Sequence, residues 1–451
     1  MKQFFITLGG ILFLFGAHSA QMVNVEYIHN AIQQKWDITI PYNSELTNPQ
    51  VVANMKYLLT AIDVANQKNG VTSNYGNSEF ATLVAADTVA TDTAIDTLIK
   101  QSAGGEEGED EEDYDDNAKY KFSITHNFNT YSDGYTIASN PDKIFRISAA
   151  GTFNIDWGDG TEEVIEKNDT NDTWYGHAYP SNGTYTIQLG GKATDYSDEE
   201  HVAAISFAGA SIDDYFAESN FFATKMSGCL GCIFSTLDDG TQPRFVSTFA
   251  NADTASEPLA LPSNLFRGIS GAPASYMFEY TFSASYIEEI PEKLFSGISG
   301  EPAEGVFNGT FSLTQIHSIP AGLFAGIKGA PAPHMFDSTF MDCSKLTAIP
   351  EGLFSGIDGP PAKSMFVGTF AYCYNLTGIP DKLFANISGD EQYMMFGHTF
   401  AYCSNLTSAS ASTNAGLLYK IWPNATSNAV VGMYSGCDGL SDYANIPNAW
   451  K

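Results

Sequence analysis

The sequence predicts a multidomain chain that ends in a repeat solenoid of helical and extended segments, preceded by a β region and a small helical region at the N-terminus. Three observations predict it. A phenylalanine pattern recurs every 29–30 residues between residues 259 and 447, an acidic run separates two earlier regions, and alternating apolar residues follow that run. A repeat of this length is typical of solenoids, in which each unit buries its apolar face against its neighbours.

Each repeat carries three phenylalanines at fixed spacing. The second lies twelve residues after the first, the third lies four residues after the second, and a proline stands four residues before the first. A spacing of four predicts one face of a helix, and the alternating stretch before the next proline predicts a short strand. The first column is Phe266, Phe295, Phe324, Phe354 and Phe384; the second is Phe278, Phe307, Phe336, Phe366 and Phe396; the third is Phe282, Phe311, Phe340, Phe370 and Phe400.

A glycine lies two residues after the first phenylalanine in four copies, and Asn386 takes its place in the fifth. Asn is the usual substitute for Gly where the backbone is left-handed, so this column predicts a helix C-cap. The glycines are Gly268, Gly297, Gly326 and Gly356.

The segments Thr339–Pro350, Thr369–Pro380 and Thr399–Thr407 resemble the BspA-like leucine-rich repeats of bacterial cell-surface proteins. The resemblance covers roughly residues 244–447. It implies a leucine-rich-repeat-like α/β solenoid, here predicted over residues 197–451, and a scaffold class associated with adhesion.

Residues that vary beside the fixed phenylalanine and cysteine columns are where we expect specificity. Tyr372, Tyr374 and Tyr402 are such residues, so they are predicted to contact a ligand. The predicted ligand is an extracellular protein or glycan.

Residues 119–196 predict β structure, because apolar and polar residues alternate along several short segments. Trp157–Thr161, followed by His177–Tyr179 and Gly183–Ile187, resembles the PKD domain of secreted proteins. That resemblance implies an immunoglobulin-like β-sandwich in which Asp159 and His177 build the fold rather than catalyse.

The chain before residue 119 divides into three predicted parts. Residues 1–20 have the short apolar run of a secretory signal peptide, and residues 21–103 contain an amphipathic pattern typical of helices. Residues 104–118 hold an acidic run and are predicted to be an extended linker. The predicted location is therefore secreted or cell surface, with no membrane insertion after signal removal.

The net charge is −31, from 52 acidic and 21 basic residues. Such a charge argues against nucleic acid or an anionic membrane as the partner.

The six cysteines form two groups. Cys229 and Cys232 have the spacing of a redox or zinc pair, of a disulfide, or of two buried small residues, and the sequence leaves these three open. The other four share one repeat column whose earlier copies hold alanine or serine, so we predict reduced, metal-free packing residues. These four are Cys343, Cys373, Cys403 and Cys437.

No catalytic, cofactor-binding or metal-ligating motif is evident, and the sequence predicts no enzyme and no cofactor. The predicted function is a binding or adhesion protein that acts through the repeats. The alternatives are a self-assembling structural component of a surface or matrix, with self-association, and an enzyme with an unrecognised site.

Overall fold

The structure is a computed structural model that describes residues 118–127, 143–181, 183–207, 223–252 and 258–451. The chain splits into two compact units, Met1–Asp113 and Tyr114–Lys451, and all described residues belong to the second. The predicted signal peptide, helical region and nearly all of the acidic linker lie outside the described residues. Among the described residues, no helix is long and apolar enough to cross a membrane.

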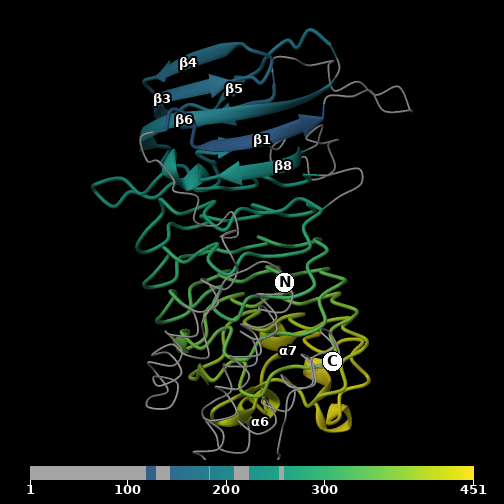
Figure 1. Cartoon of the computed structure of the whole chain (residues 1–451). Coiled ribbons are helices and arrows are strands. Elements are labelled where there is room, and N and C mark those ends of the chain that lie inside the picture. Colours follow the sequence, from purple (N-terminus) through teal and green to yellow (C-terminus); the bar gives the residue numbers. More distant parts are fainter. Residues whose placement is uncertain (1–117, 128–142, 182, 208–222, 253–257) are drawn as a thin grey trace, which may run out of the picture. The chain divides into compact units, whose positions relative to one another are not determined.

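The first part of this unit contains a five-stranded antiparallel sheet in the order β4-β3-β6-β1-β8 (Figure 1). It also contains a three-stranded antiparallel sheet in the order β5-β2-β7. Strands β7 and β8 come from beyond residue 196, the predicted end of this region. The strands are β1 (Phe122–Asn127), β2 (Phe145–Ile147), β3 (Ala149–Asp156), β4 (Glu162–Lys167), β5 (Thr173–Tyr175), β6 (Thr184–Tyr196), β7 (Ile205–Ser206) and β8 (Ala223–Gly228).

Alternation along the strands places apolar side chains between the two sheets. In β3, Phe153 and Ile155 are buried, while Thr152 between Gly151 and Phe153 is exposed. Phe145 of β2 stacks on Trp157 with ring centroids 5.6 Å apart, so the two sheets share one aromatic core. Burial on one face explains why the period-two pattern of this region could be recognised in the sequence.

The repeats themselves contain no helix. From residue 258 to residue 411 the chain forms turns and extended segments, with only the short strands β9 (Asp358–Gly359) and β10 (Asn386–Ile387). The predicted fold class, with its leucine-rich-repeat-like α/β solenoid, is therefore wrong: regular structure is mostly strands in small antiparallel sheets, and helices are few and short. The remaining elements, near the C-terminus, are β11 (Ser412–Thr413), β12 (Gly416–Leu417), α6 (Leu418–Ile421), α7 (Ser427–Val430) and the 3-10 segments η6 (Tyr443–Asn445) and η7 (Asn448–Trp450).

A left-handed residue at every fourth position replaces the predicted helix. In one copy, His334, Ser338 and Asp342 have φ of 54°, 53° and 55°. Such residues break a right-handed helix, so Phe336 and Phe340 share one face because a four-residue turn repeats, not because the backbone is helical.

Backbone hydrogen bonds alternate along these turns. The N–H of Phe336 donates to Met365 O of the next copy at 3.0 Å, whereas the N–H of Asp337 donates to His334 O within its own copy at 3.1 Å. Along these turns every second residue therefore ties one copy to the next, from the earlier copy to the later one. Elsewhere in the repeat bonds also run the other way, as from the Ser299 N–H to Gly271 O at 2.8 Å. We call each such copy a rung.

The predicted glycine C-cap is also wrong. Gly297 is not among the positive-φ glycines. A Cβ on Gly297 would lie 1.9 Å from Ile269 O in the preceding rung, so the column is glycine because two backbones touch there.

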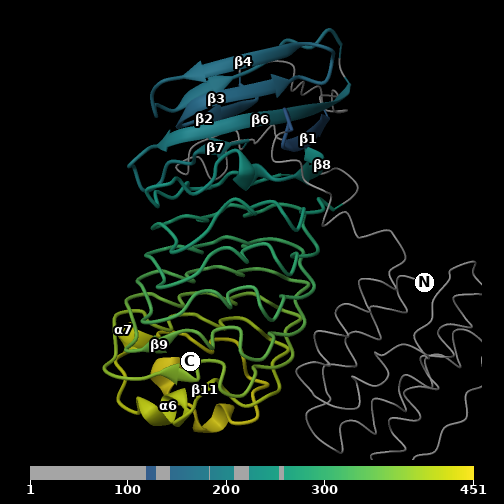
Figure 2. The ribbon, with the colours of Figure 1, turned by 60° about the vertical axis from the view of Figure 1, so that its left-hand side comes forward.

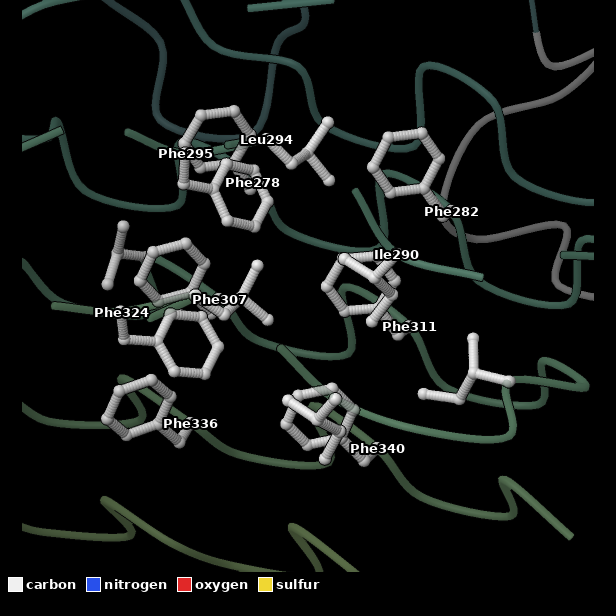
Figure 3. Close-up of a cluster of buried hydrophobic side chains, with 14 of the residues drawn as sticks. Phe278, Phe282, Ile290, Leu294, Phe295, Phe307, Phe311, Phe324, Phe336 and Phe340 are labelled. Atoms are coloured by element: carbon white, nitrogen blue, oxygen red, sulfur yellow. The ribbon is translucent and has the colours of Figure 1, made fainter. Parts of the chain in front are cut away.

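The phenylalanine columns form the core of the repeats, as Figure 3 shows for three rungs. Phe340 stacks on Phe311 at 5.7 Å and on Phe370 at 5.6 Å, with interplanar angles of 4° and 9°. All fifteen columnar phenylalanines are buried. Their burial agrees with the prediction that these residues are structural.

Both ends of the rung stack are covered (Figure 2). At the first rung, Phe249 stacks on Phe207, which follows β7, at 5.5 Å. At the last, Tyr434 stacks on Trp450 of η7 at 6.4 Å. The aromatic column therefore continues into the sheets at one end and into the C-terminal segment at the other.

Candidate recognition surface

Tyr372 and Tyr402 stand at the last left-handed position of neighbouring rungs. Their φ values are 63° and 62°, and their N–H groups donate to Ala401 O at 2.8 Å and Ser435 O at 2.6 Å. The backbone beneath each ring is thus fixed to the following rung. Tyr374 lies two residues further along, and its N–H donates to Tyr372 O at 2.9 Å.

The three predicted tyrosines come together on the surface. Tyr372 stacks on Tyr402 with centroids 4.9 Å apart and an interplanar angle of 14°, and Tyr374 meets Tyr372 edge-on at 6.2 Å. They remain 38%, 44% and 46% exposed for Tyr372, Tyr374 and Tyr402. We call these three residues the tyrosine patch.

A glycine fixes one end of the patch. A Cβ at Gly436, in the rung after Tyr402, would lie 3.0 Å from Tyr402 Cδ1. The Tyr402 ring therefore covers this glycine. At the other end, Asp342 occupies the same left-handed position in the rung before Tyr372.

Burial and a nearby carboxylate act on one hydroxyl of the patch, that of Tyr374. Partial burial raises the pKa of the Tyr374 hydroxyl, and the negative charge of Asp342 raises it further. Burial likewise raises the pKa of the Asp342 carboxyl. The Tyr374 hydroxyl is thus favoured in its protonated form, in which it can donate a hydrogen bond beside the aromatic surface of Tyr372.

The four columnar cysteines are free and buried. Each thiol donates to a phenylalanine carbonyl of the preceding rung, for example Cys373 Sγ to Phe340 O at 3.2 Å. Ser285 makes the same bond to Phe249 O at 2.5 Å in an earlier rung. Burial raises the pKa of the Cys343 thiol to about 12, so the column consists of neutral thiols. Their metal-free state stays a prediction, although no metal-binding group of three or more His, Cys, Asp or Glu occurs in the described part of the chain.

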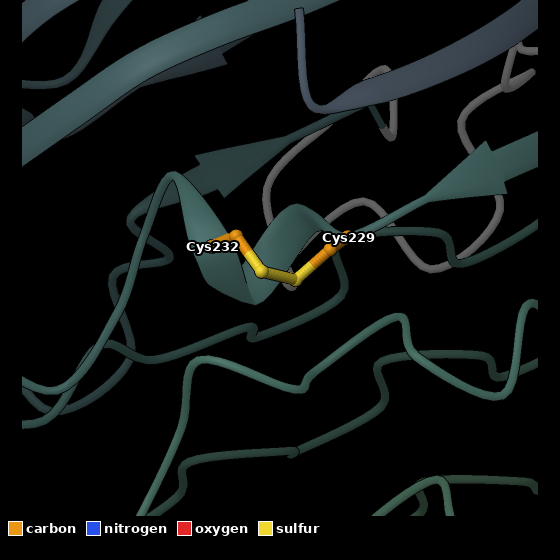
Figure 4. Close-up of a disulfide and its surroundings, with 2 residues drawn as sticks. All are labelled: Cys229 and Cys232. Atoms are coloured by element: carbon orange, nitrogen blue, oxygen red, sulfur yellow. A yellow bond between two sulfur atoms is a disulfide. The ribbon is translucent and has the colours of Figure 1, made fainter. Parts of the chain in front are cut away.

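Cys229 and Cys232 form a disulfide (Figure 4). It bridges the 3-10 segment η5 (Leu230–Cys232), which follows β8. Of the three roles that the sequence left open, the structure shows this one.

Asp159 and His177 hold the turn after Trp157. The His177 Nε2–H donates to Asp159 Oδ2 at 2.7 Å, and the His177 ring stacks on Trp157 at 5.1 Å. Hydrogen bonds from Thr161 and His177 lower the pKa of Asp159 to about 2. These contacts tie the turn Trp157–Thr161 to His177, which follows β5, in agreement with the predicted structural role.

The sequence reasoning missed a buried carboxylate in the first full rung. Glu279 is 4% exposed, accepts from His201 Nδ1 at 2.6 Å, and accepts from Asn308 Nδ2 at 2.9 Å. Burial raises the pKa of Glu279. One signal was available: the residue after the second phenylalanine is polar in three successive copies, as Glu279, Asn308 and Asp337.

No family model, curated protein or solved structure matches this chain. The resemblances to BspA-like repeats and to the PKD domain therefore stay predictions.

Proposed function

We propose that the protein is a secreted or cell-surface binding or adhesion protein that recognises an extracellular protein or glycan through the tyrosine patch. The observation that supports this function is the position of these rings. The repeats bury all fifteen columnar phenylalanines, yet Tyr372, Tyr374 and Tyr402 are left exposed together. Clustered exposed aromatics with polar tips are enriched at recognition surfaces.

The patch suits binding because it is ordered before a ligand arrives. Hydrogen bonds at 2.8 Å and 2.6 Å tie Tyr372 and Tyr402 to the following rungs, and the two rings restrain each other by stacking. A tyrosine has few rotatable bonds, so little side-chain entropy is lost on contact.

The test uses the whole chain on arrays of glycans and extracellular proteins. We expect Tyr372→Ser combined with Tyr402→Ser to weaken binding about tenfold or more, the size expected for the loss of aromatic anchors. The matched control is Tyr393→Ser, because Tyr393 is 58% exposed but makes no contact with the patch among the ring pairs of the described residues.

Equal loss in the control and the double variant would refute the patch as the contact site. Absence of any ligand together with self-association of the wild-type chain would favour the structural alternative.

A further inference from the structure

The tyrosine patch ends where the last rung lacks two side chains. His398 and Tyr402 occupy left-handed positions with φ of 54° and 62°, and the corresponding positions of the last rung are Gly432 and Gly436, with φ of 56° and 72°. The Tyr402 N–H donates to Ser435 O at 2.6 Å, which fixes this alignment of the two rungs. Two exposed rings therefore stand beside backbone that carries no side chain at either position. We call His398, Tyr402, Ser435 and Gly436 together the shelf.

One face of the Tyr402 ring is open toward the last rung. The other face stacks on Tyr372 with centroids 4.9 Å apart, and Tyr402 makes no second ring contact with any residue that the structure describes. A Cβ at Gly436 would lie 3.0 Å from Tyr402 Cδ1, so the base of the ring stands against Gly436. Gly436 nevertheless remains exposed, and Tyr402 is 46% exposed. The outer part of this ring face is therefore accessible to a ligand.

Two polar side chains of the shelf have hydrogen-bonding groups to spare. Ser435 is partly buried, its N–H donates to Gly432 O at 3.1 Å, and its hydroxyl makes no hydrogen bond within the described part of the chain. His398 is exposed, and neither of its ring nitrogens is bonded to a described residue. A Cβ at Gly432 would lie 2.8 Å from His398 Nδ1, so the His398 ring lies over that glycine. A hydroxyl and an imidazole can each donate and accept.

The chain around the shelf is nearly free of charge. From Met394 to Cys437 the only Asp, Glu, Lys or Arg is Lys420, in a chain with 52 acidic and 21 basic residues. Lys420 belongs to α6 and lies over the Tyr419 ring at 5.9 Å. Asp438 is the first charged residue after the shelf. An anionic ligand would therefore lose hydration without gaining a counter-charge, and the Asp438 carboxylate would repel it.

These features favour an uncharged ligand that has both C–H and hydroxyl surface. Aromatic ring faces carry partial negative charge and attract the weakly positive C–H groups of a ligand. The hydroxyl and imidazole beside the ring can exchange hydrogen bonds with the hydroxyl groups of a ligand. A protein ligand needs a wider apolar contact, whereas Val164 of β4 is the only exposed large apolar side chain besides tyrosines among the described residues. A neutral sugar ring meets these requirements.

We propose that the shelf binds an uncharged sugar unit of a glycan. The C–H face of the sugar packs on the open face of Tyr402, and its hydroxyl groups form hydrogen bonds with the Ser435 hydroxyl and the His398 ring. The proposal rests on the function proposed above, because Tyr402 belongs to both the tyrosine patch and the shelf. It narrows the ligand from a protein or glycan to a neutral glycan.

The test compares sugars that differ in one group. Glucose, galactose and mannose are each displayed on a neutral support beside the uronate and the amino sugar of the same configuration, and binding of the whole chain is measured. We expect a neutral sugar to bind at least about tenfold more tightly than its two charged counterparts. Added salt should leave this binding unchanged, because no ion pair contributes to it.

A substitution that fills the shelf tests its position. Gly436→Asn should weaken binding of the neutral sugar at least about tenfold, because the new side chain would occupy the space in front of Tyr402. Asn tolerates positive φ, and Asp342 and Tyr372 show that a side chain fits at this position of a rung. The matched control is Gly352→Asn, since Gly352 is likewise exposed with φ of 72° but lies in another rung. It should leave binding unchanged.

A second pair of variants tests the hydrogen bond. Ser435→Ala should weaken binding about two- to tenfold, the loss expected for one hydrogen bond. Ser318→Ala, at an exposed serine of another rung, should have no effect. Thermal unfolding of each variant establishes that it is folded.

Equal binding of neutral and charged sugars would overturn the proposal, and so would unchanged binding in Gly436→Asn. Failure of the shelf differs from failure of the proposed function. If an extracellular protein binds and Tyr372→Ser with Tyr402→Ser weakens it, while no neutral sugar binds, the shelf proposal is wrong and the proposed function stands. If the wild-type chain binds neither proteins nor glycans, both are wrong.

Discussion

Phe370→Ala is the most direct test of the stacked core. Phe370 is fully buried and stacks on Phe340 and on Phe400, each with centroids 5.6 Å apart, and it contacts Phe354 at 6.3 Å. Truncation to alanine leaves a cavity with aromatic walls on three sides. Substitutions of this kind cost about 3–5 kcal/mol, and we expect the upper part of that range because two ring stacks are lost as well.

The free energy of unfolding from urea titration measures this cost, and hydrogen exchange locates it. Since each rung contacts only its neighbours, the loss of protection should centre on the amides that Phe370 and its two neighbouring rungs share. Tyr374→Ala is the matched control, because Tyr374 stands four residues later in the same rung and is 44% exposed. It should change the free energy by about 0.5 kcal/mol or less.

Unchanged unfolding in Phe370→Ala would refute the stacked-core reasoning. So would a loss of protection spread evenly over the sheets and the repeats.

Three further predictions follow from single contacts. Cys373→Ser should leave stability nearly unchanged, since a hydroxyl can donate to Phe340 O as the Ser285 hydroxyl donates to Phe249 O in its own rung. Cys373→Val should cost about 0.5–1.5 kcal/mol, because it removes one hydrogen bond and leaves Phe340 O only the Cys343 N–H donor at 3.3 Å; equal unfolding midpoints for the two variants would contradict this. Glu279→Gln should become more stable relative to wild type as pH rises from about 4 to 7. Burial raises the folded-state pKa of Glu279, so wild-type stability is highest below the unfolded-state pKa and is lost as pH rises through the folded-state pKa, whereas Gln does not titrate. A stability difference in favour of the variant that is larger at pH 4 than at pH 7 would show the sign to be wrong. Gly297→Ala should destabilise by more than about 1 kcal/mol through its contact with the preceding rung, and Gly322→Ala, where no atom lies within 4 Å of the new Cβ, should not; comparable midpoints in thermal unfolding would count against the close-contact explanation.

The sequence reveals which residues are buried better than it reveals the backbone that buries them. Columns at fixed spacing mark Phe336 and Phe340 as a common face, and both are buried. The same spacing of four suits a helix and a four-residue turn, and periodicity alone does not separate them. Sister copies carried the deciding signal, because the position of Ser338 is Gly309 and Gly368 in neighbouring rungs, and all three have positive φ.

The tyrosine patch shows what sequence variation can and cannot predict. Tyr372, Tyr374 and Tyr402 could be selected because they vary beside fixed columns, and they do lie together on the surface. The close crossing at Gly190 had no such signal. Lys119 and Gly190 are far apart in the sequence, and only the antiparallel pairing of β1 with β6 places Lys119 O where it would lie 1.7 Å from a Cβ on Gly190.

The direction of the hydrogen bonds in the phenylalanine-bearing turns explains why the stack of turns has two different ends. In these turns each rung donates N–H groups forward, so there the first rung presents carbonyls and the last presents N–H groups, whereas elsewhere in the repeat bonds also run backward, as from the Lys328 N–H to Gly300 O at 2.8 Å. At the first rung, the Phe207 N–H donates to Thr248 O at 2.9 Å, and at the last, the Tyr434 N–H donates to Trp450 O at 2.8 Å. Unpaired buried backbone groups are costly. The stack therefore needs N–H donors to cover the carbonyls of its first rung and carbonyl acceptors to cover the N–H groups of its last rung. The sheets are therefore part of the same structure as the repeats, and the strands β7 and β8 from beyond residue 196 are what join them.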